Sequence, residues 1–351
     1  MFSKPHRIFL VFFSACFLLI VQCSKSETTH QQLNTITAKD SIPSHDTIDS
    51  TSSLTSKTQL DTALYNTLLL HLVHNKPNNK FPVKTAYPLP GAILPFKRVV
   101  TYYGNFYSAG MGILGELSPD VMLQQLNTEV KRWSYADTAV PVQPALEYIA
   151  VTAQRNPGKD AMYRLRMPFN QIDKALELCK QANAILILDV QVGHCSLMQE
   201  IPALLPYLKM PEVHLAIDPE YSMKDGAVPC SEIGTFDADD INYTSDYLAQ
   251  IVRAYNLPPK ILIVHRFTKA MVTHYKNITT KPEVQIVMNM DGFGFPAKKI
   301  DTYKSWIAGE PVQFTGFKLF YKNDIKSAPY RLMTPAEILS LNPSPIYIQY
   351  Q

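Results

Sequence analysis

The sequence carries little excess charge of either sign. Its 33 Lys and Arg residues nearly balance 30 Asp and Glu residues, which gives a formal net charge of +3 over 351 residues. No long basic run occurs, and basic and aromatic residues are not interleaved in the way that nucleic-acid binding requires. We therefore expect no nucleic-acid partner.

Motifs for common cofactors are also missing. No GxGxxG or GxxxxGK[ST] follows any apolar run, which argues against a dinucleotide or P-loop site. The five cysteines include no CxxC pair, so a structural zinc site has little support. Positions 179, 195 and 230 hold an odd number of cysteines, which allow at most one disulfide among them. The sequence predicts neither a cofactor nor a metal.

The N-terminus has the pattern of an export signal. Basic residues at positions 4 and 7 precede an apolar run over 8–21 that is short for a membrane span. Cys16 follows small residues as in a lipobox, and Cys23 is a poorer match. We expect an exported protein, either a cell-envelope lipoprotein modified at Cys16 or Cys23 or a secreted one. A signal peptide that is cleaved without lipid, or one that stays as an anchor, is the alternative, and a lipid anchor is the only membrane contact that we expect.

Composition divides the chain into four parts. After the signal segment at 1–23, about half of the residues over 24–58 are Ser or Thr, a composition too poor in apolar residues to fold, which predicts a disordered tether. Residues 59–95 combine apolar residues at helical spacing over 60–74 with a Pro- and Asn-rich stretch, and predict a short docking helix and a linker. Residues 96–351 form the fourth part.

This last part alternates apolar runs with amphipathic helical stretches. Ser118-Pro119-Asp120 and Thr334-Pro335-Ala336-Glu337 are typical helix starts. Near-continuous apolar strands are typical of a parallel sheet buried on both faces, and about eight repeats favour a closed (β/α)8 barrel of the TIM type over an open doubly wound sheet. The predicted strands are 98–103, 145–152, 184–192, 213–218, 260–266, 284–290, 314–320 and 346–350.

Acidic residues follow several of these strands. Functional groups of such barrels gather at the carboxyl ends of the strands, where the sequence places four acids: Asp189, Asp218, Glu220 and Asp291. Because strand side chains alternate with period two, Asp218 and Glu220 would share one face. Carboxyl groups that lie close together do not all ionise easily, so one stays protonated while another is ionised. General acid catalysis uses such a pair. The alternative is that these acids cap helices or form plain ion pairs with His265 and Arg266.

The segment LAIDPEY (215–221) resembles the fourth-strand ending of D-x-E barrel glycosidases, namely the chitinase class and the DxE-type lysozymes. The resemblance implies that Glu220 is the acid on the glycosidic oxygen and Asp218 its helper, with Asp189 or Asp291 as a partner. VMNMD (287–291) and TYYGN (101–105) are similar to the sixth and first strands of the chitinase class. The longer D-x-x-D-x-D-x-E pattern is absent, because His214 and Ala216 stand at its earlier positions. The barrel region also looks like a bacterial family of exported, lipoprotein-like barrels with YYG, LDxQxG, DPE and DGxG at strand ends, which implies no particular activity.

Aromatic and polar residues near the same strand ends are candidates for substrate binding. Aromatic faces stack on sugar rings, and hydroxyl and amide groups can hydrogen-bond to a substrate at the solvent-exposed end of the barrel. Lys318 would serve as the counter-ion of a carboxylate. The candidates are Tyr102, Tyr103, Gln191, His265, Asn289, Lys318 and Tyr321.

We therefore expect an exported glycoside hydrolase or related protein that acts on a glycan or another small polar substrate. Two alternatives stay open. One is a metal-dependent hydrolase or phosphodiesterase that holds a divalent cation with Asp189, Asp218, Glu220, Asp291 and His265. The other is a non-catalytic module that binds glycan or cell wall.

Overall fold

The computed structural model describes residues 59–351. The predicted signal segment, the lipidation candidates Cys16 and Cys23 and the predicted tether over 24–58 lie outside the described residues. Among the described residues, no helix is long and apolar enough to cross a membrane.

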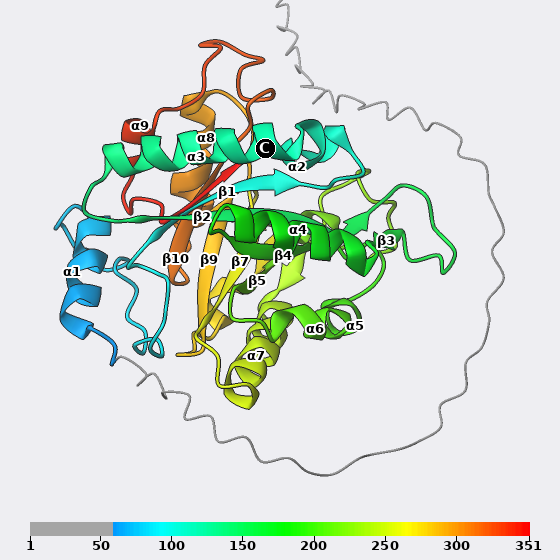
Figure 1. Cartoon of the computed structure of the whole chain (residues 1–351), viewed down its shortest axis with the longest axis horizontal. Helices are drawn as coiled ribbons and strands as arrows, with labels where there is room; N and C mark the ends of the chain where they lie inside the picture. The colour runs from blue at the N-terminus through cyan, green and yellow to red at the C-terminus, as the bar shows by residue number, and fades with distance from the viewer. Residues whose placement is uncertain (1–58) are drawn as a thin grey trace, which may run out of the picture. The chain divides into compact units, whose positions relative to one another are not determined.

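Eight parallel strands close into a barrel, as the sequence predicts (Figure 1). Neighbouring strands pair in the order β1, β11, β10, β9, β7, β5, β4, β2, and β1 pairs with β2 to complete the ring. The strands are β1 (Arg98–Gly104), β2 (Val142–Ala153), β4 (Ile185–Val190), β5 (Val213–Ile217), β7 (Lys260–Arg266), β9 (Val284–Met290), β10 (Phe314–Leu319) and β11 (Tyr347–Tyr350). Three short strands lie in the loops: β3 (Arg164–Arg166), which pairs antiparallel with β2, β6 (Phe236–Asp237) and β8 (Val272–Thr273).

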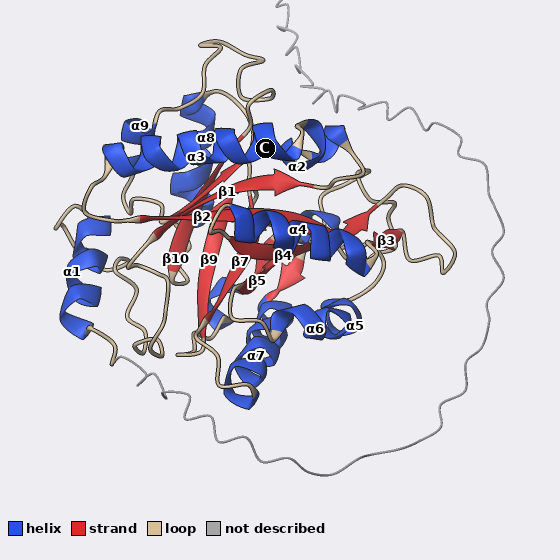
Figure 2. Ribbon diagram, in the orientation of Figure 1, coloured by secondary structure: helices blue, strands red, loops and turns tan. Residues whose placement is uncertain are grey.

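Helices cover the outside of the ring (Figure 2). The helices are α1 (Thr62–Leu72), α2 (Ile113–Glu116), α3 (Pro119–Ala136), α4 (Phe169–Gln181), α5 (Leu197–Glu200), α6 (Leu205–Leu208), α7 (Ala238–Ala254), α8 (Pro296–Thr302) and α9 (Pro335–Leu339). The predicted capping box at Thr334 is present, and Ser118 precedes α3 without a side-chain capping bond. Buried Trp133 of α3 donates from Nε1 to the Tyr350 hydroxyl at 2.9 Å, which fixes this helix to β11.

The barrel interior changes from apolar to polar along the strands. Its apolar part includes Val99, Ala145, Ile187, Ile263 and Val287, all fully buried. Inward positions nearer the carboxyl ends carry acids, amides, a histidine and a lysine instead. The apolar layers supply the core, and the polar layers form the candidate site.

Helix α1 packs against the amino-terminal end of the barrel. Asp61 caps the helix by accepting a hydrogen bond from the backbone nitrogen of Leu64. Leu68 and Leu72 join the interior apolar cluster, and the Leu72 carbonyl accepts from the backbone nitrogen of Ser344 at 2.7 Å. Helix α1 thus covers part of this end of the barrel, and a pocket lined by Tyr65, Phe81 and Phe314 lies beside it.

Strand β5 ends earlier than predicted. It stops at Ile217, and Pro219–Tyr221 forms a 3-10 turn. Pro219 has no backbone N–H with which to continue the ladder, and Asp218 caps the turn by accepting from the backbone nitrogen of Glu220 at 3.0 Å. Asp218 and Glu220 therefore do not share a strand face, contrary to the period-two prediction.

Candidate active site at the carboxyl ends of the strands

An ion-pair network crosses the barrel interior. His265 on β7 contacts Glu147 on β2 through Nε2 and Oε1 at 3.0 Å, and Asp291 after β9 through Nδ1 and Oδ2 at 3.0 Å. Lys318 on β10 contacts the other oxygen of Asp291 at 2.9 Å. Glu147 also accepts a hydrogen bond from the Tyr347 hydroxyl. Two cations and two carboxylates thus compensate one another inside the ring.

Tyr103 on β1 organises the next part of the site. Its hydroxyl donates to Oδ2 of Asp189 at 2.9 Å and accepts from Nε2 of Gln191 at 3.2 Å. The Nζ atom of Lys318 lies 4.0 Å from the centre of the Tyr103 ring, a cation–π contact. Asp189 on β4 and Gln191 just after it thus point to the same side, as the sequence predicts.

Amides form a neighbouring layer. Nδ2 of Asn289 donates to Oε1 of Gln349 at 3.1 Å and lies 3.4 Å from Nδ1 of His265. Space for Asn289 depends on Gly316, where an added Cβ would lie 2.6 Å from Oδ1 of Asn289. A side chain at 316 would therefore collide with this layer.

The environment divides the acids into two kinds. Burial alone would raise the pKa of Asp291, but Lys318 and His265 hold it below its usual value. Burial, followed by the charge of Asp291, raises the pKa of Glu220 to about 7. Burial also raises the pKa of Asp189 to about 6 and that of Asp218 well above its usual range, and His265 opposes both shifts.

Two carboxylates favour the cationic form of His265. Burial would lower its pKa, but Asp291 and Glu147 raise it well above the usual value for histidine. The carboxylate on each side of the ring stabilises a proton on each nitrogen.

Most of the predicted site residues lie together. The cluster contains Asp189, Asp218, Asp291, Tyr103, Gln191, His265, Asn289 and Lys318, which are all buried, and half-buried Glu220 at its edge. Tyr102 and Tyr321 lie outside this cluster. Because Tyr103 points inward, Tyr102 points outward, where its hydroxyl lies 3.1 Å from that of Tyr321, which donates to Glu129 of α3.

Three residues of the site were not predicted: Glu147, Tyr347 and Gln349. Glu147 stands alone as a charge within the apolar run of β2, a signal that the sequence does contain. Tyr347 and Gln349 alternate along β11 with Ile348 and Tyr350, which point outward. The four-residue sequence YIQY does not indicate which pair faces the barrel interior.

Aromatic side chains border the site on one side. Phe293, in the loop after β9, is 55% exposed, and its ring packs edge-on against that of Phe320 at 6.0 Å between centroids. Phe320 in turn lies 5.0 Å from Nζ of Lys318. This pair offers an apolar surface directly beside the charged cluster.

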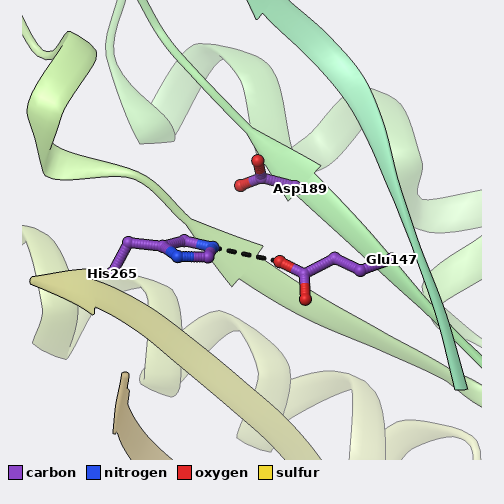
Figure 3. Close-up of side chains that lie close together, drawn as sticks. All are labelled: Glu147, Asp189 and His265. Carbon is purple, nitrogen blue, oxygen red and sulfur yellow. Dashed lines mark hydrogen bonds and ion pairs between the residues drawn. The ribbon is translucent and has the colours of Figure 1, made fainter. Parts of the chain in front are cut away.

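Three of these side chains also have the composition of a metal site. Glu147, Asp189 and His265 each provide a ligand atom, and the three atoms lie within 4.8 Å of one another. Figure 3 shows His265 and Glu147 extending toward each other from separate strands, with the carboxylate of Asp189 near their contact.

No protein-family model matches the sequence, and no curated protein matches it. Among solved structures, the chain is similar to a GH5-4 broad specificity endoglucanase from Clostridium acetobutylicum, with a TM-score of 0.33 and 8% identity over 60% of this chain and 76% of that one. A GH5 xyloglucan-specific endo-β-1,4-glucanase from a metagenomic library gives a TM-score of 0.32 and 12% identity over 65% and 77% of the two chains. A sugar phosphate isomerase/epimerase from Parabacteroides distasonis gives a TM-score of 0.31 and 10% identity, over 77% of this chain and 90% of that one. At these TM-scores the likeness says nothing about activity, and the barrel assignment rests on the strand pairing of this chain.

Proposed function

We propose that the chain is a glycoside hydrolase with its active site at the carboxyl end of the barrel and Glu220 as the general acid. The observation that carries this proposal is the contrast between Glu220 and Asp291. Asp291 is ion-paired with Lys318 and His265, whereas Glu220 forms no salt bridge among the described residues. One carboxyl thus keeps its proton up to a pKa of about 7 while another is ionised, and glycoside hydrolysis uses such a pair.

Each group then has a separate role. Glu220, at the edge of the cluster, donates its proton to the glycosidic oxygen as the bond to the leaving group breaks. Asp291 stabilises the positive charge that develops on the sugar ring. Asp218 positions Glu220, because its carboxylate holds the backbone nitrogen of Glu220 in the 3-10 turn.

The surroundings fit a carbohydrate better than a purely apolar ligand. Gln191 and Tyr103 place an amide and a hydroxyl inside the buried cluster, while exposed Phe293 presents a ring face beside it. Sugars present hydroxyl groups at their edges and C–H groups on their faces, and this combination matches both.

The general-acid role is tested with paired aryl glycosides that differ in their leaving group. Glu220→Gln should lower kcat/KM about 10²- to 10⁴-fold for 4-methylumbelliferyl glycosides. The loss should be much smaller for 2,4-dinitrophenyl glycosides, because dinitrophenolate leaves without a proton. Glu177→Gln is the matched control, because Glu177 lies exposed on α4. Equal losses for both substrates, or full activity of Glu220→Gln, would contradict the proposal. Binding of glycan without turnover of any glycoside would point to the non-catalytic module.

We also propose that the protein is exported, with a lipid on Cys16 or Cys23. The proposal rests on the basic start, the apolar run and the small residues before Cys16. Metabolic labelling with a palmitate analogue should mark the full chain and fail to mark the double Cys16→Ser, Cys23→Ser variant. Recovery of unlabelled protein from the cytoplasm would contradict it.

A further inference from the structure

We propose that Glu147, Asp189 and His265 form a binding site for one divalent first-row transition metal ion within the barrel. The site goes beyond the proposed hydrolase function and does not depend on it. It also differs from the cation site considered from the sequence, which did not include Glu147.

The first argument is convergence. The three side chains come from three strands, β2, β4 and β7, and all three are 0% exposed. One ligand atom from each lies within 4.8 Å of the others. Ligands of one zinc ion, at about 2.0–2.2 Å from the metal, are separated by roughly 3–4 Å. Small side-chain movements therefore bring the three atoms onto one ion.

The second argument is an unpaired acceptor. Oδ1 of Asp189 is buried and has no hydrogen-bond partner within residues 59–351. An unsatisfied buried carboxylate oxygen is costly and calls for an explanation. The other oxygen of the same group accepts from Tyr103, so the carboxylate is held in place while its Oδ1 atom is buried and bonded by no described residue.

The third argument is the outer layer of contacts. Asp291 accepts from Nδ1 of His265, the Tyr103 hydroxyl donates to Asp189, and the Tyr347 hydroxyl donates to Glu147. Each of the three residues thus has one atom fixed by a neighbour. Of the second atoms, Nε2 of His265 and Oε1 of Glu147 face each other at 3.0 Å, and Oδ1 of Asp189 has no hydrogen-bond partner within residues 59–351. Carboxylate contacts to the far nitrogen of a metal-binding histidine have this arrangement in known metal sites.

The ligand set selects the kind of ion. Two carboxylates and one imidazole suit zinc or manganese better than calcium, which takes 6–8 oxygen ligands. The two negative charges match a dipositive ion. Binding replaces the proton that Nε2 of His265 shares with Glu147, and that proton is released to solvent, so charge and atoms balance.

Metal content and thermal unfolding test the site without any glycoside substrate. The full chain is dialysed against EDTA, incubated with ZnCl₂ or MnCl₂ and passed through a desalting column, and retained metal is measured by mass spectrometry. We expect about one equivalent of zinc or manganese per chain and a melting temperature raised by several degrees, with neither effect from CaCl₂.

Two conservative variants and one control complete the design. Asp189→Asn and Glu147→Gln should each lower retained metal at least about tenfold and remove the thermal shift, in line with loss of a ligand. Asp301→Asn, an exposed residue of α8, should behave as the wild type. Circular dichroism identifies the variants that fold, and either one that folds is sufficient. Metal retained equally by a folded variant, or no retained metal in the wild type, would overturn the proposal. Because neither readout uses catalysis, failure of the metal site leaves the test of Glu220 unaffected.

Discussion

Nε2 of His265 and Oε1 of Glu147 meet at 3.0 Å although their strands, β7 and β2, are separated in the ring by β5 and β4. The contact therefore spans the barrel interior. It links the two sides of the site through charge. It also explains why Glu147, on the second barrel strand, belongs to a cluster whose other acids lie at the ends of later strands.

The pH dependence of turnover should report the protonation of Glu220. A general acid must be protonated, and the protonated fraction falls as pH rises through the pKa of about 7. We expect kcat/KM for a 4-methylumbelliferyl glycoside to decline above pH 7, and the decline to be absent in Glu220→Gln. A wild-type profile that is flat from pH 6 to 9 would contradict the assignment.

Loss of Lys318 should destabilise the protein strongly. Lys318→Met leaves the buried Asp291 carboxylate with only His265 as a partner, and breaking a buried ion pair costs about 3–5 kcal/mol. Lys322→Met, which removes an exposed cation, should change the free energy of unfolding by less than about 0.5 kcal/mol. Urea unfolding measures both. The double variant Lys318→Met, Asp291→Asn should be more stable than Lys318→Met alone, and additive losses would contradict the pairing.

Gly316→Ala tests the packing of the barrel interior. The added methyl would lie 2.6 Å from Oδ1 of Asn289 and 2.9 Å from Cδ1 of Tyr347. Overpacking of this kind typically costs about 1–3 kcal/mol, which calorimetry would record as a lower melting temperature. Gly110→Ala is the control, because within 4 Å its added methyl would meet Oγ of Ser108 alone among the described residues, at 3.8 Å. Similar melting temperatures for the two variants would disprove the tight fit.

The buried Lys260 should make stability rise with pH. Burial lowers its pKa in the folded state to about 7, whereas an unfolded lysine titrates near 10.4. Between these values the unfolded chain binds more protons, so the free energy of unfolding increases with pH, by up to about 1.4 kcal/mol per unit.

Lys260→Met should lack this increase. Urea unfolding at pH 7 and pH 9 compares the slopes, and exposed Lys269→Met should follow the wild type. Parallel slopes for Lys260→Met and the wild type would show that Lys260 does not titrate in this range.

The sequence predicted the barrel because its signals are local. Each strand is a largely apolar run. Few architectures other than a closed barrel contain eight such strands that alternate with helices. The path after β5 was not predicted, because period-two reasoning assumes that a strand continues. Pro219 ends the ladder, and Asp218 turns back to cap the next residues.

The site was predicted in part for a related reason. Asp189, His265 and Asp291 stand at strand ends, where barrels place function, so position alone was enough. Glu147 lies inside β2, and its partner His265 is 118 positions away along the chain. Such a contact depends on which strands face each other across the closed barrel, and the order of residues along the chain does not reveal this. Tyr102 and Tyr321 were assigned to the site because they are aromatic residues near strand ends, and that position does not say which way a side chain points.

The position of α1 has a practical consequence for attaching the protein to other molecules. The described chain begins beside α1, at the amino ends of the barrel strands, whereas β11 runs toward their carboxyl ends and Gln351 bonds to the backbone of Leu319 and Tyr321 there. A purification tag, a fluorophore or a solid support joined ahead of α1 is attached at the end of the barrel opposite the candidate site. The same addition after Gln351 is attached at the end that carries the candidate site and crowds any ligand that approaches there.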